Sequence, residues 1–341
     1  MTVTLNRRRF IAISAAALGL SVGAGIRGAS AGTGTLHRWN GTALGARASI
    51  LLHHPDAGRA QGLLDECVRE IARLEAMFSI YRADSALSYL NRDGRLDGAP
   101  LDLIHLLGES RRFSRLSAGA FDISVQPLFA LHARYRGAGE KPSAAEIDAA
   151  RALVDYRQIE ISTGRIAFAR PGMALTLNGI AQGYITDRVA ELLRARAMGE
   201  VLVNLGEVRG LGRHPSGRPW HVGLENPPGH DGTLRRIELN EDSPAVATSA
   251  AHGHWFGAPR GRFGAPRGRH HLLDPASGAS AMRHASVSVC ARDAMTADAL
   301  STALAILPLD RAADCLQAVA PATAYFTAWD GVRSVRHGQA V

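Results

Sequence analysis

The feature that most constrains the fold is a one-sided helical pattern near the start of the chain. Between Ala60 and Phe78, apolar side chains recur at three- and four-residue spacing, at Leu63, Leu64, Cys67, Ile71, Leu74 and Met77. This spacing aligns them along one side of an α-helix, which must pack on another layer of structure. A second helix with an apolar side is predicted over Ile180 to Arg196.

Short apolar runs elsewhere predict strands and further helices. Helices are expected at 101–116 and 296–307, with a helical turn at 85–90 and a helix start at Ser143. Strands are expected at 47–53, a pair within 154–168, and 201–205, 220–224, 235–239, 245–249, 271–273, 286–291 and 325–329. The predicted fold class is α+β, with mixed helices and a largely antiparallel sheet.

The first 31 residues have the pattern of an export signal. Arg7, Arg8 and Arg9 precede Phe10, an apolar stretch of moderate hydrophobicity runs from Ile11 to about residue 24, and Ala-Ser-Ala closes the segment at 29–31. The arginine pair followed by phenylalanine is typical of a twin-arginine signal. A membrane anchor is the alternative, although the apolar stretch is short. We expect a soluble periplasmic protein that comprises one domain, residues 32–341.

The charge of the chain gives weak support to a nucleic-acid partner. The net charge is +8, and four of the arginines lie in the leader, which carries no acids, so the remainder is near +4. One lysine, Lys141, stands against 38 arginines, a skew that reflects codon usage more often than a phosphate-binding patch. No basic stripe interleaved with aromatics is present in the sequence.

The cysteines and one tandem repeat are interpreted as structural. Cys67, Cys290 and Cys315 occupy apolar settings and form no CxxC pair, so buried thiols are predicted. Residues 256–262 and 263–269 repeat the same seven letters, FGAPRGR. Two copies are too few for a solenoid, and a loop insertion without a catalytic role is expected.

Three segments carry residues suited to chemistry. Glycines at Gly179 and Gly183 bracket the first turn of the helix from Ile180, and such a helix start suits phosphate, although glycine also serves packing there. Asp298 and Thr302 are four residues apart on a helix and can offer two hard oxygen ligands to Mg²⁺. The alternative is an acid that complements the helix dipole and a threonine in the core.

The third segment runs from His270 through Asp274-Pro275 to Gly278. A histidine on a strand before a tight Asp-Pro turn can act as a general base or a phosphate contact. An aspartate that only stabilises the turn is the competing interpretation.

In their order along the chain, these segments resemble the ApbE family of FAD:protein FMN transferases. The resemblance runs from about Leu36 to the C-terminus. It is carried by seven ordered motifs: Met77–Tyr81 with Ser85, Leu90 and Asn91; Gly119–Ser124 with Pro127-Leu128; Asn178–Tyr184 with Asp187; Val203–Gly206; Ala247–Ser249; His271–Pro275 with Gly278; and Ala297–Leu300 with Thr302.

The resemblance implies an ApbE-like, T-fold-like architecture and a role for each matching position. It assigns Mg²⁺ to the backbone carbonyl of Gly179 and the side chains of Asp298 and Thr302. It assigns FAD to Tyr81, Gly119, Ala120, Phe121, Thr176, Gln182, Thr248 and the backbone of Leu272. His271 matches a histidine implicated in turnover, and His271 and Asp298 are the expected catalytic residues, with the general base left open between His271 and a metal-linked carboxylate.

The implied reaction is transfer of FMN from FAD to a Ser or Thr hydroxyl of another flavoprotein, with release of AMP. Magnesium would neutralise charge on the pyrophosphate. The segment Leu177 to Gly183 resembles members associated with nitrous-oxide respiration, the NosX-like subgroup, which implies a membrane-bound acceptor.

Four positions depart from the family pattern. Thr176 stands where the family usually has Asp, Gln182 where Lys or Glu is usual, Leu44 in place of Met, and Ala250 in place of Gly. Three alternatives therefore stay open: a protein that binds FAD or hydrolyses it to FMN and AMP, an assembly factor without flavin, and a transition-metal site at His252, His254, His270 and His271.

Overall fold

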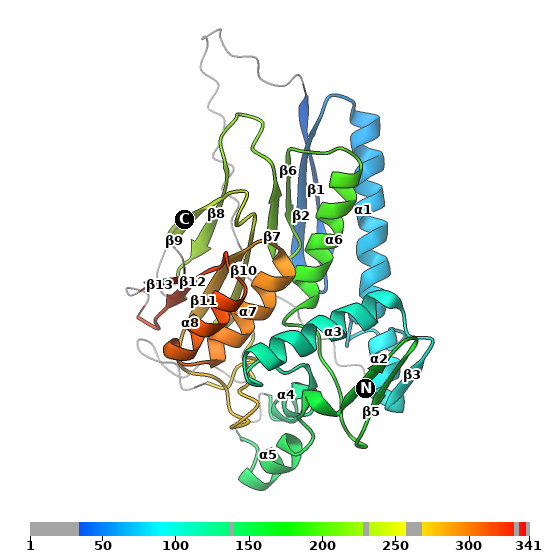
Figure 1. Ribbon diagram of the computed structural model, residues 1–341, viewed down its shortest axis with the longest axis vertical. Coiled ribbons are helices and arrows are strands. Elements are labelled where there is room, and N and C mark those ends of the chain that lie inside the picture. The colour runs from blue at the N-terminus through cyan, green and yellow to red at the C-terminus, as the bar shows by residue number, and fades with distance from the viewer. Residues whose placement is uncertain (1–33, 137–139, 228–231, 257–267, 331–333, 339–341) are drawn as a thin grey trace.

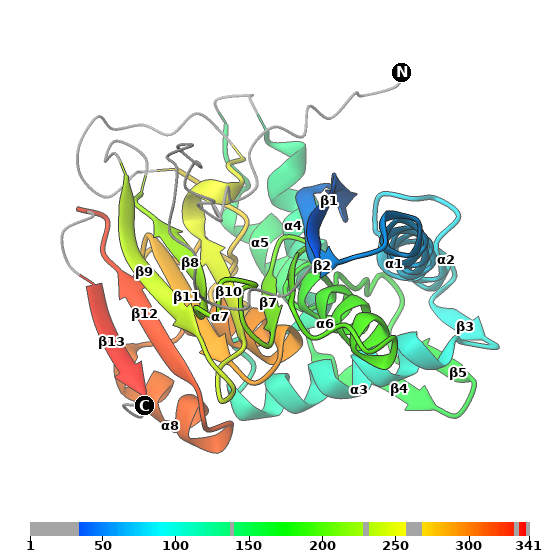
Figure 2. The same cartoon turned by 90° about the horizontal axis from the view of Figure 1, so that it is seen from above.

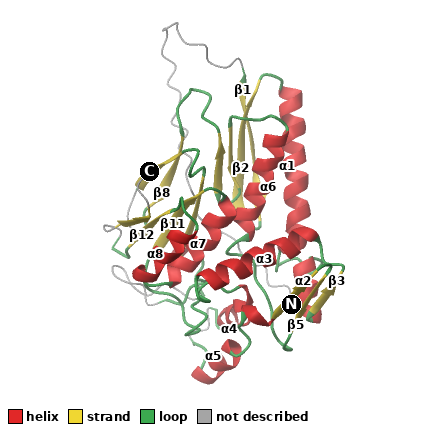
Figure 3. Ribbon diagram, viewed as in Figure 1, coloured by secondary structure: helices red, strands yellow, loops and turns green. Residues whose placement is uncertain are grey.

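A computed structural model describes residues 34–136, 140–227, 232–256, 268–330 and 334–338 (Figure 1). The leader predicted at 1–31 and most of the 256–269 repeat lie outside these ranges. Helices and strands are mixed along the described chain (Figure 3), as the predicted α+β class requires. None of the helices in the described ranges is long and apolar enough to cross a membrane.

The centre of the fold is an eight-stranded sheet in the order β1-β2-β6-β7-β10-β11-β12-β13. Each described pairing in it is antiparallel, which confirms the predicted sheet type. The strands are β1 (Thr35–Ala43), β2 (Ala46–His54), β6 (Val201–Asn204), β7 (Val208–Leu211), β10 (Ala245–Ala250), β11 (Ser286–Ala291), β12 (Thr323–Thr327) and β13 (Ser334–Gly338).

Two smaller sheets accompany it. One has the order β3-β5-β4, and the other is the hairpin of β8 and β9. Their strands are β3 (Arg95–Asp97), β4 (Ile159–Ser162), β5 (Arg165–Phe168), β8 (Trp220–Glu225) and β9 (Thr233–Leu239). The helices are α1 (Ala57–Phe78), α2 (Ala86–Asp93), α3 (Leu101–Leu116), α4 (Gln126–Arg134), α5 (Ala144–Arg151), α6 (Ala181–Ala195), α7 (Ala294–Ile306) and α8 (Leu309–Ala318).

The two faces of the large sheet are covered differently. Helices α6 and α7 lie on one face, and the β8–β9 hairpin lies on the other (Figure 2). The helical face buries the main core, including alternate residues such as Val201 and Val203 of β6. The hairpin face buries a second core, in which Trp220 packs with Leu202 and Val246 from the sheet. Because side chains alternate along a strand, one sheet serves both cores.

Local capping explains where the long helices begin. Asp56 accepts a hydrogen bond from the Arg59 amide at the start of α1 (2.9 Å), and Asp293 accepts one from the Thr296 amide at the start of α7 (2.7 Å). Helix α7 is buried on nearly all sides, and Asp298 is its one charged side chain. Charged side chains are rarely buried so deeply unless they are paired, so a single aspartate on this helix indicates a functional role.

Most predicted elements are confirmed to within a few residues. The strand predicted at 271–273 is wrong, because His270 and Leu273 make only isolated bridges and the chain then turns at Asp274. Strands β1, β3, β7 and β13 and helices α4 and α8 were not predicted. All three cysteines are free and buried, which confirms the structural interpretation.

Candidate metal and flavin site

Helices α6 and α7 approach so closely that one position admits no side chain. A Cβ added at Gly183 would lie 2.3 Å from the carbonyl oxygen of Ala294 and 2.7 Å from the Cα of Met295. Both are backbone atoms of α7, so neither can move aside without shifting the helix. Gly183 therefore sets the distance between the two helices and the depth at which α7 presents its polar residues.

Asp298 lies in this contact and is 3% exposed. Its Oδ2 accepts a hydrogen bond from the Gly183 amide (3.0 Å), and none of the ion pairs among the described residues includes it. Burial raises the pKa of Asp298 to about 7, and the Gly183 hydrogen bond opposes that shift. A buried carboxylate with one donor and no cation is poorly compensated by the protein alone.

One turn further along α7, Thr302 faces Gly179. A Cβ added at Gly179 would lie 2.8 Å from Thr302 Oγ1 and 3.3 Å from the ring of Phe121. Thr302 Oγ1 also lies 3.1 Å from Ser249 Oγ, which is 2.8 Å from Ser301 Oγ. The absence of a side chain at Gly179 leaves room beside a cluster of hydroxyl groups.

These residues fit a small, hard cation. The structure brings together Asp298, Thr302 and Gly179, which the family resemblance assigns to one metal site and which are called the metal residues below. Gly179 is more than 100 residues from the other two in the sequence. A carboxylate, a hydroxyl and a backbone carbonyl are the oxygen donors that Mg²⁺ prefers. The poorly compensated charge of Asp298 and the room beside Gly179 are the observations that favour such an ion.

Several backbone amides at the start of α6 have partners within the protein, which favours packing over phosphate binding as the role of Gly183. The amides of Ala181 and Tyr184 bond to backbone carbonyls, and that of Gly183 is held by Asp298. The helix dipole thus stabilises an internal carboxylate. Of the two interpretations, packing explains Gly183, and the room beside the metal residues explains Gly179.

The segment predicted to contact flavin adjoins the metal residues. Phe121 is buried with its ring beside Gly179, and Gly119 has a positive φ of 86° that turns the chain before it. Ala120 is buried in a small apolar cluster with Ala281 and Ile306. Tyr81, by contrast, is 45% exposed.

Of three other predicted FAD contacts, Thr176 and Thr248 have polar partners within the protein, and Gln182 has a close packing contact. Thr176 Oγ1 accepts from the Asn178 amide (3.3 Å), and Thr248 Oγ1 lies 2.8 Å from Ser288 Oγ. Gln182 packs against Gly206, where an added Cβ would fall 2.4 Å from Gln182 Nε2. Gln182 immediately precedes Gly183, so it borders the metal residues.

His271 belongs to a separate group of histidines. Its ring centroid is 6.2 Å from that of His254 and 6.4 Å from that of His270. Burial lowers the pKa of His271 to about 3 and that of His270 to about 4, so both rings are neutral at pH 7. The amide of Leu272 donates to His270 Nδ1 (3.3 Å), and its carbonyl accepts from Ala281.

This group gives no support to a transition-metal site. Within the ranges that the structure describes, no three His, Cys, Asp or Glu side chains are arranged to hold a metal ion. The hypothesis built on His252, His254, His270 and His271 lacks a ligand set there. The segment from His252 directly follows β10, whose Ser249 contacts Thr302, so this strand connects the histidines with one of the metal residues.

Comparison with known proteins identifies the family. The family model described as the ApbE family matches residues 44–326, well over half of the chain. The chain belongs to the ApbE family. It is 28% identical to the FAD:protein FMN transferase of Haemophilus influenzae over 251 residues, 70% of each chain. It is 28% identical to that of Treponema pallidum over 280 residues, which cover 76% of this chain and 75% of the relative.

Solved ApbE structures share the fold. The flavinyl transferase ApbE of Pseudomonas stutzeri superposes with a TM-score of 0.74 at 27% identity, over 90% of this chain and 98% of that one. The flavin transferase ApbE of Vibrio cholerae gives 0.73 at 24% identity, over 89% and 97%. The predicted ApbE-like architecture is therefore confirmed.

Two functional candidates in this ApbE-family chain were given no role from the sequence: Glu207 was not singled out there, and Asp187 was named only as part of a motif. Glu207 is 4% exposed, and burial, followed by the charge of Asp298, raises its pKa well above the ordinary value. Asp187 pairs with Arg209 and accepts the amides of Ala294 (2.9 Å) and Met295 (2.8 Å), so it holds the start of α7. For Glu207, the available signal was a single acid between apolar residues just after the Val203–Gly206 motif.

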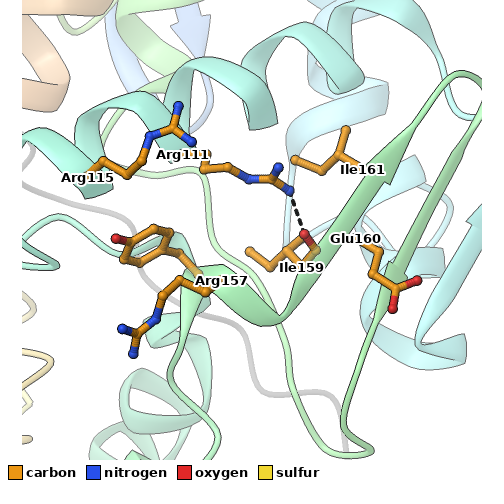
Figure 4. Close-up of a pocket in the computed structure, with 7 residues that line it drawn as sticks. Arg111, Arg115, Arg157, Ile159, Glu160 and Ile161 are labelled. Atoms are coloured by element: carbon orange, nitrogen blue, oxygen red, sulfur yellow. Dashed lines mark hydrogen bonds between the residues drawn. The ribbon is translucent and has the colours of Figure 1, made fainter.

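Two cavities in the described structure lie apart from the metal residues. The first, of about 550 Å³, is lined by Arg111, Arg115, Arg157 and Tyr156 among others (Figure 4). Arg111 donates to the carbonyl of Ile159 (2.6 Å). The second, of about 470 Å³, lies beside the Asp187–Arg209 pair. Neither is lined by Gly179, Asp298 or Thr302, so cavity size does not locate the site.

Proposed function

We propose that this chain is a Mg²⁺-dependent FAD:protein FMN transferase, which moves FMN from FAD to a Ser or Thr hydroxyl of an acceptor flavoprotein. The observation that supports this proposal most directly is that Asp298 and Thr302 of α7 pack against the segment from Gly179 to Gly183 inside the protein. That contact occurs in a chain matching the ApbE family over residues 44–326, whose curated relatives described above are named FAD:protein FMN transferase.

The proposed reaction is a phosphoryl transfer in which one phosphorus–oxygen bond forms and another breaks. The acceptor hydroxyl oxygen bonds to the phosphorus of the FMN half of FAD. The bond from that phosphorus to the bridging oxygen breaks, AMP leaves with the bridging oxygen, and the hydroxyl proton passes to a base. Positioning and charge neutralisation dominate catalysis of this type.

The chain's own residues support this chemistry by position. Asp298, Thr302 and the carbonyl of Gly179 would hold Mg²⁺, which when bound neutralises charge on phosphate oxygens. Phe121 adjoins Gly179 and forms an apolar wall next to that position. The flavin contacts implied at Gly119 to Phe121 therefore border the place where the pyrophosphate would lie.

The base for the acceptor hydroxyl is better sought among carboxylates than at His271. A group with a pKa near 3 is a weak proton acceptor at neutral pH. His271 Nδ1 lies 3.3 Å from the carbonyl oxygen of His254, which fixes the ring orientation. We infer that His271 orients substrate as a neutral hydrogen-bonding group.

FAD pyrophosphatase activity is the second candidate. It is favoured by Thr176, which replaces the usual family Asp and uses its hydroxyl in the local turn with Asn178. A chain that had lost one FAD contact would hold the acceptor complex less well, and water would then replace the acceptor hydroxyl. FMN and AMP would be the products.

The experiment combines purified protein, FAD, Mg²⁺ and a flavoprotein domain bearing an acceptor Ser or Thr. In-gel flavin fluorescence of the denatured acceptor and release of AMP are both measured, with Asp298→Ala as the control. A fluorescent band that requires Mg²⁺ and is lost in the control supports the transferase. AMP without a band supports the pyrophosphatase, and no FAD binding contradicts both.

The cellular setting forms part of the proposal. The twin-arginine pattern at Arg7 to Phe10 supports export to the periplasm, where the acceptor would be a periplasmic or membrane-bound flavoprotein. The likeness of residues 177–183 to the NosX-like subgroup favours an acceptor in nitrous-oxide respiration. Labelled-protein fractionation and flavin fluorescence of membrane proteins from a deletion strain would test both points.

A further inference from the structure

Glu207 occupies a position where an acid is costly. It follows Gly206 in the tight connection between β6 and β7, and its neighbours Leu205 and Val208 are buried in the core. Only 4% of Glu207 is exposed. A carboxylate taken out of water destabilises the folded protein unless hydrogen bonds or an opposite charge compensate it.

The described residues give Glu207 little compensation. Its Oε2 accepts one hydrogen bond, from the Thr248 amide at 3.2 Å. None of the ion pairs among the described residues includes Glu207, and the nearby Arg209 is paired with Asp187. One amide donor is less than a buried carboxylate requires, so the charge balance here is incomplete.

Two short paths connect Glu207 with the metal residues. On one side, Thr248 donates to Glu207, and the next residue, Ser249, contacts Thr302 (3.1 Å). On the other side, Gly206 packs against Gln182, which precedes the Gly183 amide that holds Asp298. Glu207 is thus linked to Thr302 through β10, and its neighbour Gly206 is linked through α6 to the amide that Asp298 accepts.

We propose that Glu207 is a second carboxylate of the metal centre, contributing negative charge to a divalent cation held by Asp298, either directly or through one water molecule. The names and family match reported above assign no role to this residue. A cation of charge +2 balances the two buried acids, which neither the Thr248 nor the Gly183 amide does alone. The proposal rests on the proposed function only in that it takes the metal to be present.

The test measures metal binding rather than turnover. Full-chain protein is titrated with Mn²⁺, the free ion is followed by its EPR signal, and Mg²⁺ is added as competitor. Glu207→Gln keeps the shape and removes the charge, so we expect its dissociation constants for both ions to rise at least about ten-fold. Glu241→Gln, at an exposed position, is the matched control and should bind as the wild type does.

Thermal unfolding separates this role from a structural one. Without metal, Glu207→Gln should unfold at the wild-type temperature or above, because a neutral amide of the same shape replaces an acid that burial destabilises. With Mg²⁺, the stabilisation of wild type should be largely lost in the variant. If Glu207→Gln folds poorly, Glu207→Asp provides the second measurement, and it should bind Mn²⁺ at least about three-fold more weakly than wild type, because the shorter acid stands farther from the cation.

The outcomes distinguish this inference from the proposed function. If wild type binds Mn²⁺ and Asp298→Asn does not, the metal site holds, and wild-type affinity in Glu207→Gln and Glu207→Asp then overturns the role of Glu207 alone. If wild type binds neither ion with or without FAD, the metal-dependent function and the role of Glu207 both fail.

Discussion

At the scale of single residues, Gly183 is a position where one added methyl group would disturb the candidate site. An alanine there would place its Cβ against backbone atoms of Ala294 and Met295, which belong to the helix that carries Asp298. We expect Gly183→Ala to lower the free energy of unfolding by about 2–3 kcal/mol through overpacking, as measured by urea denaturation.

The control for this change is Gly62→Ala in the exposed part of α1. A Cβ at Gly62 meets nothing within 4 Å, so alanine should raise stability by about 0.5–1 kcal/mol through helix propensity. Equal effects of the two substitutions would contradict the close approach of α6 and α7 as the cause.

His270 provides a pH-dependent prediction at the same scale. Burial lowers its folded-state pKa from 6.5 to about 4. Between these values the unfolded chain binds a proton that the folded chain does not. The contribution of neutral His270 to the free energy of unfolding is therefore complete above pH 6.5 and is lost as the pH falls towards 4. The free energy of unfolding of His270→Gln should therefore decrease less steeply with falling pH than that of wild type, by at most about 1.4 kcal/mol per pH unit.

Urea denaturation at several pH values between 7 and 4.5 measures this slope. The exposed His105→Gln substitution is the matched control for removal of an imidazole. Parallel stability curves for wild type and His270→Gln would show that His270 binds its proton equally well in the folded and unfolded chain, which would contradict the prediction. Protonation would also oppose the Leu272 amide, which donates to His270 Nδ1.

How well the sequence predicted the site depends on the spacing of its residues. Asp298 and Thr302 could be paired from their four-residue separation, because helix geometry relates such positions directly. Glu207 could not be paired with Asp298, since their proximity depends on the register of β10 with its neighbours. The resemblance to the ApbE family supplied the link from Asp298 to Gly179, which local patterns do not contain.

At the scale of elements, α7 depends on a buried ion pair at its start. Asp187 accepts two α7 amides and pairs with Arg209. We expect Asp187→Asn to cost about 3–5 kcal/mol, because it leaves Arg209 buried without a counter-charge. Equilibrium unfolding in urea measures the effect.

A double-mutant cycle tests the same pair from both sides. Arg209→Met alone leaves Asp187 with its two amide donors, so its cost should be smaller. The combined variant should be more stable than the sum of the single effects by at least about 1 kcal/mol. Strict additivity would show that Asp187 acts only as a cap for α7.

Elements were predicted best where a single periodicity dominates. The bounds of α1, α3 and α6 match the apolar spacing closely. The segment 271–273 was wrongly predicted to be a strand because its residues are mostly apolar. Its backbone is instead held by turns around Asp274, with Gly278 at a φ of 71°. The apolar side chains of that segment are buried although their backbone forms a loop. Apolar residues in a loop follow no helix or strand periodicity, so the pattern could not reveal the structure.

At the scale of the whole molecule, the large sheet is stable only because both faces are covered. Trp220 of the β8–β9 hairpin is buried in the second core and donates from Nε1 to the carbonyl of Leu211 (3.3 Å). Trp220→Ala should therefore cost about 3–5 kcal/mol. Thermal and urea unfolding measure it, and a cost below about 1 kcal/mol would mean that the hairpin face contributes little.

The overall class could be predicted, but the pairing of strands could not. Alternating apolar residues indicate that a strand has a buried face, but they do not name its partner. Strand β2 pairs with β6 across helices α1 to α6, and β7 pairs with β10 across the β8–β9 hairpin. Such pairings depend on tertiary packing of α1, α6 and α7 rather than on local propensity. The second core could not be predicted from the sequence either, because its buried residues come from seven strands, β6 to β12.

The hydrogen bond from Gly183 to Asp298 also bears on which ion the protein would accept. Because Oδ2 is engaged by an amide of α6, Asp298 would present its other oxygen to a bound metal and would coordinate it through one atom. Calcium gains from carboxylates that chelate through both oxygens and from a crowded shell of six to eight ligands, whereas magnesium needs fewer protein ligands and retains water. Discrimination between the two ions would then originate in the spacing of two helices, fixed by a residue that touches neither ion.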